Sequence, residues 1–196
     1  MAQPTQRAGE VASTDPRILR SRRMLMDSLV RLLSRKEFDD ISVQEIAEEA
    51  TLNRATFYLH YPDKNAILRA MTAQRFRDLI ARRGLAFTNC DDALRAIALG
   101  VCDYLAESTG CPGQLAKMPL EGSIIPVVED MFREGARNHA VKPGVDPELL
   151  ATTAAWAIFG AARGWHQTPD RIPAEEMARK IEAMVKPLFL SASPKP

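Results

Sequence analysis

The stretch from residue 42 to residue 62 restricts the possible folds most strongly, because it holds start and stop signals for two very short helices. The sequence SVQE at 42–45 fits a capping box, in which Ser42 and Glu45 satisfy each other's free backbone amides. Asn53 is a good N-cap for the second helix. Tyr61-Pro62 must end that helix, because a residue before proline avoids the helical region. The spacing therefore predicts two short helices joined by a tight turn.

Apolar residues at helical spacing predict the flanking elements, and no strand-like alternation competes with them. Asp15-Pro16 and Asp63 are start signals for two long helices, expected over 16–35 and 64–83. With the short pair between them, this gives four consecutive helices. The fold class expected is all-α.

Beyond residue 84, glycine and proline punctuation separates further helices. The stretch 124–132 has one apolar stripe, and Pro126 is expected near enough to the start of its helix to be tolerated. Residues 149–166 are apolar nearly all round, which predicts a helix buried on more than one side. A last helix carries the stripe Met177, Ile181, Met184 and Leu188.

Charge is distributed unevenly along the chain, although the net charge is only +1. Residues 16–83 hold 14 Lys and Arg against 9 Asp and Glu, whereas residues 84–196 hold 11 against 14. The first half therefore suits contact with a polyanion. The first two turns of the first expected helix are the most basic part, at the end where the helix dipole disfavours cations, and we expect an anionic partner near Arg17, Arg20, Arg22 and Arg23.

The two short helices form a helix-turn-helix by spacing, a unit that places its second helix in the major groove of DNA. On the outer face of that helix, Arg54 can bond guanine, Thr56 can reach a base or a thymine methyl, and Tyr58 can reach a base or a phosphate. Phe57 and Leu52 are expected to point inward. The alternative is an internal packing motif with a solvated polar rim.

The flanking residues are expected to meet the DNA strand beside the groove. Ser42 and Gln44 open the first short helix, and Gln44 is long enough to reach a base. His60 and Lys64 lie just before or at the start of the next long helix, whose free amides also favour a phosphate.

The stretch RRMLMDSLVRLLSRKEFDDISVQEIAEEATLNRATFYLHYPDKNAIL resembles the DNA-binding domain of TetR/AcrR-type transcriptional regulators. The resemblance implies a three-helix DNA-binding domain, a fourth connecting helix, a larger helical domain that binds a small effector, and a homodimer. Thr51 and Glu37 depart from the family, which often has glycine at these two turns. The DNA-binding residues expected are Ser42, Gln44, Asn53, Arg54, Ala55, Thr56, Tyr58, His60 and Lys64.

The domain organisation follows from these elements. We expect a disordered segment (1–15), a DNA-binding domain (16–63), a connecting helix (64–83), a ligand-binding and dimerisation domain (84–190) and a flexible tail (191–196). No apolar run is long enough to span a membrane, and the first fifteen residues lack the apolar stretch of a signal peptide. A cytoplasmic protein with no membrane partner is expected.

The last two long helices are the expected dimer interface, as a four-helix bundle with the pair from a second subunit. Small residues would let a partner helix approach, and larger ones would add apolar area. The alternative is that these stripes only fill the core of a monomer. The expected interface residues are Ala157, Gly160, Ala161, Gly164, Trp165, Ile181, Met184 and Leu188.

An effector pocket is expected among aromatic and flexible side chains of the middle helices, although each of them also suits a plain core. The expected effector is an apolar or aromatic compound whose binding releases the DNA-binding domains from a palindromic operator. Repression and activation both fit the chain, because the position of the operator decides between them. The expected pocket residues are Phe76, Tyr104, Met118, Met131, Phe132 and Trp156.

Control without a small effector and enzymatic activity are the alternative functions. Cys90, Cys102 and Cys111 match neither a disulfide framework nor a zinc site, so they are expected as reduced apolar fillers, with a redox sensor as the alternative. A regulator without a small effector, controlled by a protein partner or by cysteine oxidation, is the second hypothesis. A helical enzyme is the third, but neither a catalytic constellation nor a metal or cofactor motif is recognisable.

Overall fold

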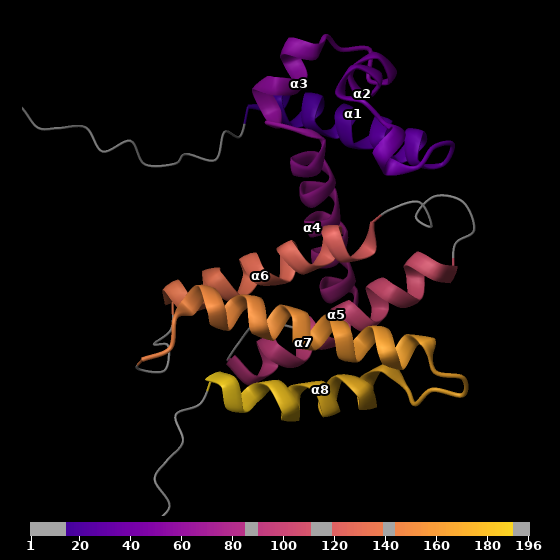
Figure 1. Ribbon diagram of the computed structural model, residues 1–196. Coiled ribbons are helices and arrows are strands. Elements are labelled where there is room, and N and C mark those ends of the chain that lie inside the picture. The colour runs from indigo at the N-terminus through magenta and orange to yellow at the C-terminus, as the bar shows by residue number, and fades with distance from the viewer. Residues whose placement is uncertain (1–14, 85–89, 111–118, 139–143, 190–196) are drawn as a thin grey trace, which may run out of the picture.

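The computed structural model describes residues 15–84, 90–110, 119–138 and 144–189, and over these residues it contains eight α-helices and one 3-10 turn but no strand (Figure 1). The all-α prediction is confirmed. In chain order the elements are α1 (Pro16–Leu33), η1 (Phe38–Asp40), α2 (Val43–Glu49), α3 (Arg54–His60), α4 (Lys64–Arg82), α5 (Cys90–Gly110), α6 (Leu120–Asn138), α7 (Pro147–Gln167) and α8 (Ala174–Phe189).

The predicted N-caps start four of these helices. The side chain of Asp15 accepts from the Arg17 amide at α1, and that of Asp63 accepts from the Ala66 amide at α4. At α2 the Ser42–Glu45 capping box is present in both directions, and Asn53 caps α3. Local hydrogen-bonding chemistry thus fixes where the elements of the N-terminal domain begin. The ends are one or two residues earlier than expected, at Leu33 for α1 and Arg82 for α4.

The turn between α2 and α3 is a Schellman motif, in which Leu52 N donates to Ala47 O and Thr51 N donates to Glu48 O, both at 2.9 Å. Thr51 sits at the left-handed position of the motif with φ of 56°. This is the conformation that favours glycine, so the departure at Thr51 has a conformational cost. Glu37 has φ of −65°, which any residue adopts, so the absence of glycine at this position has no conformational cost.

Helices α1 to α3 and the first half of α4 enclose one apolar core, which includes Leu29, Ile46, Phe57 and Ile67. Helices α5 to α8 enclose a second core together with the second half of α4. Helix α4 therefore belongs to both: its early residues pack with α1 to α3, and Phe76 packs into the larger domain. Figure 1 shows α4 running from the small domain into the large one.

The second half of α4 is held tightly by its neighbours. A Cβ added at Gly100 of α5 would lie 2.9 Å from the Phe76 ring, so glycine permits a close approach of the two helices there. At the end of α4, the Arg83 guanidinium binds Asp103 of α5 at 2.7 Å and Glu175 of α8 at 2.5 Å. A displacement of α4 must therefore disturb both contacts.

Helix α6 differs from the expectation at Pro126. The helix starts at Leu120, so the proline is its seventh residue and lies inside the helix instead of near its start. A proline there has no amide hydrogen to donate to the carbonyl of the preceding turn. Across the described residues, none of the helices is both long enough and apolar enough to cross a membrane.

Candidate nucleic-acid interface

Helix α3 is anchored by one buried aromatic residue and by a tight cap. Phe57 is fully buried, and its ring makes an edge contact with Tyr58 and a tilted contact with Tyr61. Asn53 Oδ1 accepts from Thr56 N at 2.7 Å and from Thr56 Oγ1 at 2.9 Å. A helix of seven residues is marginal alone, so its position depends on these contacts.

The cap changes the interpretation of two expected contact residues. Thr56 is half-buried and its hydroxyl donates to Asn53, so its proton is committed within the helix start. Asn53 uses its side-chain oxygen for the same cap. Both residues therefore shape α3, whereas direct base contacts by them remain a prediction.

The outward face of α3 carries Arg54, Ala55, Tyr58 and Leu59, all exposed. Arg54 Nη2 donates to Tyr58 Oη at 3.1 Å, and the guanidinium carbon lies 5.4 Å from the Tyr58 ring centroid. This contact restricts the rotamers of Arg54 before any partner binds. Leu59 was not among the expected residues, yet it is 82% exposed, the largest value among the exposed large apolar side chains. Its position one turn after Ala55 is the signal that would have identified it.

Helix α2 contributes two further residues from the expected set. Ser42 is exposed, but its hydroxyl and amide both donate to Glu45 Oε2 at 2.9 Å. Gln44 is exposed as well, and its Nε2 donates to Glu48 Oε1 at 2.6 Å. To contact a base, the side-chain amide of Gln44 must first release the Glu48 carboxylate.

Lys64 is located differently from the expectation that it faces a phosphate. Its Nζ donates to the backbone oxygens of Phe38, Asp39 and Ile41 at 3.0, 2.9 and 3.1 Å, and it lies 4.8 Å from the Phe38 ring centroid. An ammonium has three donors, and all three are used here. Lys64 thus fastens α4 to the turn between α1 and α2.

His60 ends α3 and is half-buried. Burial, followed by the nearby Arg22 guanidinium, lowers the pKa of His60 below its ordinary value of 6.5. The imidazole is therefore mainly neutral at pH 7 in the free protein, where it can donate a hydrogen bond to an anion but supplies no charge.

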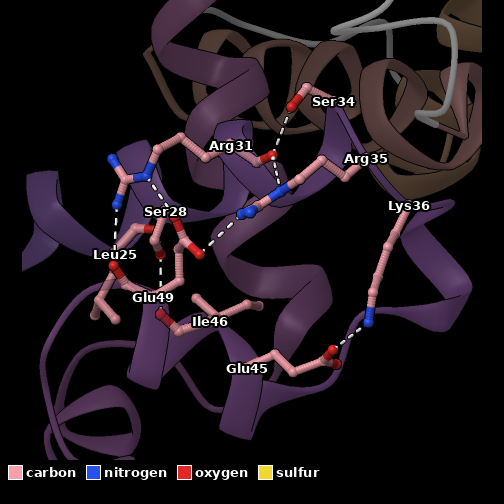
Figure 2. Close-up of polar contacts among 9 residues, drawn as sticks. All are labelled: Leu25, Ser28, Arg31, Ser34, Arg35, Lys36, Glu45, Ile46 and Glu49. Carbon is pink, nitrogen blue, oxygen red and sulfur yellow. Dashed lines mark hydrogen bonds and ion pairs between the residues drawn. The ribbon is translucent and has the colours of Figure 1, made fainter.

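Polar contacts between α1 and α2 hold the helix-turn-helix in place (Figure 2). Glu49 accepts from Arg31 Nε and from Arg35 Nη2, both at 2.8 Å, and Lys36 forms an ion pair with Glu45. Ser28 is fully buried, with its Oγ 3.0 Å from Ile46 O. These contacts orient α2 on α1, and through the turn they orient α3.

The expected effector residues do not all come together. Phe76 and Tyr104 are fully buried in the larger core, and Met131 and Phe132 are half-buried against it. Trp156 is 52% exposed on the outer side of α7, so its assignment to an internal pocket is wrong. Met118 lies outside the described residues. The core also holds a polar pair, since Tyr104 Oη and Ser123 Oγ are 3.1 Å apart.

The expected dimer residues separate into two groups. Trp165 and Ile181 are buried within the single chain, so assigning them to an interface is wrong. Trp165 Nε1 donates to Ile172 O at 2.7 Å, which fixes the ring inside. Ala161 is half-buried. The remaining members are exposed on α7 and α8, namely Ala157, Gly160, Gly164, Met184 and Leu188.

Cys102 is the cysteine whose surroundings the structure describes, and it is fully buried. Burial, with the charge of Asp103, raises the pKa of its thiol to about 12. A thiol in this state is a poor nucleophile, so Cys102 is not suited to sense oxidants.

Known proteins resemble this chain in sequence and fold. A model of the family described as "Bacterial regulatory proteins, tetR family" matches residues 25–71. The HTH-type transcriptional regulator EthR of Mycolicibacterium smegmatis is 28% identical over 167 residues, which cover 83% of this chain and 70% of that protein. The uncharacterized HTH-type transcriptional regulator YuxN of Bacillus subtilis is 33% identical over 49 residues, which are 25% of this chain and 17% of that protein.

Solved structures share the fold at low sequence identity. A TetR-family regulator from Streptomyces coelicolor is 16% identical, with 90% of this chain and 98% of that chain covered and a TM-score of 0.65. Lin0861 from Listeria innocua is also 16% identical, with 95% and 96% covered and a TM-score of 0.60. These likenesses extend across both the DNA-binding helices and the larger helical domain.

Proposed function

Since this chain is a TetR-type transcriptional regulator, we propose that it is a homodimeric repressor, which a small apolar or aromatic effector releases from a palindromic operator. The observation that carries the proposal is the exposed face of α3, where Arg54, Tyr58 and Leu59 project from a helix fixed on its other side by Phe57. A face that combines a cation, an aromatic hydroxyl and an apolar side chain suits the major groove, which offers base acceptors, phosphates and thymine methyls.

The proposed roles on DNA follow from the chemistry of each side chain. Arg54 reads guanine as a bidentate donor and is oriented by Tyr58. Leu59 and Ala55 contact thymine methyls, which are the apolar groups that the major groove offers. His60 donates to a phosphate, and Gln44 reaches a base edge on release from Glu48.

The proposed dimer joins α7 and α8 of two copies. Gly160 and Gly164 are exposed, and a Cβ added at either would meet no described residue of the same chain within 4 Å. Packing inside the chain therefore gives no reason for glycine at these positions, whereas a close partner helix does. Trp156 and Met184 lie on the exposed sides of the same two helices and would supply apolar area.

The proposed effector binds in the larger domain near Phe76, Tyr104, Met131 and Phe132. Phe76 belongs to α4, so a ligand there contacts the helix that also packs into the DNA-binding core. A ligand that prefers one position of α4 would shift DNA affinity by its coupling free energy, commonly about 1–3 kcal/mol. The alternative of control by oxidation gains no support from Cys102.

Selection of bound duplexes from a random DNA pool tests the proposal most directly. We expect a palindrome whose half-sites lie about 34–36 Å apart or a multiple of that spacing. Arg54→Ala is expected to relax sequence preference at one position of each half-site, at a loss of about 1–3 kcal/mol. Recovery of no enriched sequence by the wild-type protein would refute the proposed function.

A further inference from the structure

The first two turns of α1 carry four arginines whose charge the fold does not use. We call Arg17, Arg20, Arg22 and Arg23 the basic patch; all four are exposed. Within the described residues, the only carboxylate in salt-bridge range of a patch guanidinium is Asp27, which is 4.0 Å from Arg23 with both side chains largely exposed. Such a pair contributes little.

The end of the same helix and the residues just after it are arranged in the opposite way. Arg31 and Arg35 both bind the Glu49 carboxylate at 2.8 Å and thereby hold α2. The first turn of α1 contains no acidic residue. Cations in the first turn of a helix oppose its dipole. The stability of the helix therefore does not explain the basic patch.

The basic patch lies beside the recognition helix. The guanidinium carbon of Arg22 is 5.5 Å from the centroid of the Tyr61 ring, and Tyr61 directly follows the last residue of α3. Figure 1 shows the start of α1 next to α3. The patch is thus continuous with the surface that α3 presents.

We infer that the basic patch binds the sugar–phosphate backbone of DNA beside the major groove that α3 enters. This inference rests on the proposed function. Duplex DNA carries one negative charge per about 1.7 Å of its axis, which suits a cluster of exposed guanidinium groups. Guanidinium groups also bind phosphate oxygens in a bidentate manner. These contacts add affinity on every sequence and fix the orientation of α3 in the groove.

The test is the salt dependence of binding to a 30-base-pair duplex of random sequence. Each phosphate contact contributes about 0.9 to the slope of log affinity against log salt concentration. In the triple variant R17Q/R20Q/R23Q, which leaves the Arg22–Tyr61 contact intact, the slope is expected to fall by at least about 0.9. The same three positions changed to lysine should retain the slope, because lysine keeps the charge.

Arg137→Gln is the matched control, because Arg137 is exposed on α6 in the larger domain and should leave the slope unchanged. The melting temperature of the triple glutamine variant should equal or exceed that of the wild type, since a conflict with the helix dipole is removed. If the wild type binds the duplex and the triple variant keeps its slope, the inference is wrong and the proposed function stands. If the wild type does not bind, both are wrong.

Discussion

At the residue scale, Thr51 is the position where sequence and backbone disagree. It holds the left-handed place of the Schellman motif after α2, with φ of 56°, and a β-branched residue is disfavoured there. Thr51→Gly is expected to raise the free energy of unfolding by about 1 kcal/mol, measured by urea denaturation. Gly84 follows α4 with φ of +64°, so Gly84→Thr should lower the free energy of unfolding by a similar amount. Equal stability of both variants and the wild type would contradict this account.

Lys64 gives a second prediction at this scale. Lys64→Met leaves the carbonyls of Phe38, Asp39 and Ile41 without their shared donor, and we expect a loss of about 2 kcal/mol in unfolding free energy. Lys36→Met removes only a surface ion pair with Glu45 and should cost less than about 1 kcal/mol. If Lys64→Met kept full stability but weakened DNA binding, the phosphate role first expected for Lys64 would be correct instead.

At the element scale, the contacts between α1 and α2 should make the DNA-binding domain sensitive to acid. Hydrogen bonds from Lys36 and from the Ser42 amide and hydroxyl lower the pKa of Glu45 from 4.5 to about 2, and Arg31 and Arg35 lower the pKa of Glu49. Because both pKa values are depressed by folding, their contribution is present above the ordinary carboxyl pKa of 4.5 and is lost as pH falls through the folded pKa values, which for Glu45 is about 2.

The measurement is the urea midpoint of unfolding as a function of pH. The double variant E45Q/E49Q should be less stable than wild type at pH 7, and the difference should shrink below pH 4.5. Glu134→Gln changes an exposed glutamate of α6 for which no ion pair occurs among the described residues, and its pH profile should match that of the wild type. A pH-independent difference for the double variant would show that these carboxylates are not linked to folding.

The predictability of these elements depended on how local the responsible interactions are. The starts of α2 and α3 were readable because Ser42–Glu45 and Asn53 act within one turn. The location of Lys64 could not be predicted from the sequence, because its partners lie 23 to 26 residues earlier in the chain. Helix α7 is apolar on nearly all sides, so periodicity did not separate the exposed Trp156 from the buried Trp165.

At the scale of the whole molecule, α4 is the mechanical connection between the two cores. Its first half packs with α1 to α3, and its second half is fixed by Phe76 and by the Arg83 contacts to Asp103 and Glu175. Among the described residues α4 contributes to both cores, so a change in the larger domain can reach α1 to α3 by moving α4. The proposed binding to a palindrome requires that two such domains be held at a fixed spacing, which is the role proposed for the dimer.

Gly160→Leu tests that requirement. Gly160 is exposed, and a Cβ there meets nothing within 4 Å among the described residues, so we expect helicity and the melting temperature of the isolated subunit to be preserved. It would obstruct a helix that approaches α7, and we expect monomers in sedimentation at micromolar concentration. Palindromic DNA should then bind without cooperation between half-sites.

The two tryptophans supply an independent signal for the same variant. Trp165 is buried in either state, whereas Trp156 is 52% exposed in the single chain, so its emission should shift to longer wavelength in the Gly160→Leu monomer. Gly135→Leu is the matched control, because a Cβ at Gly135 of α6 also meets nothing within 4 Å. The control should remain dimeric with wild-type emission. A dimeric Gly160→Leu protein would place the interface away from this face of α7, and the exposed glycines would then need another cause.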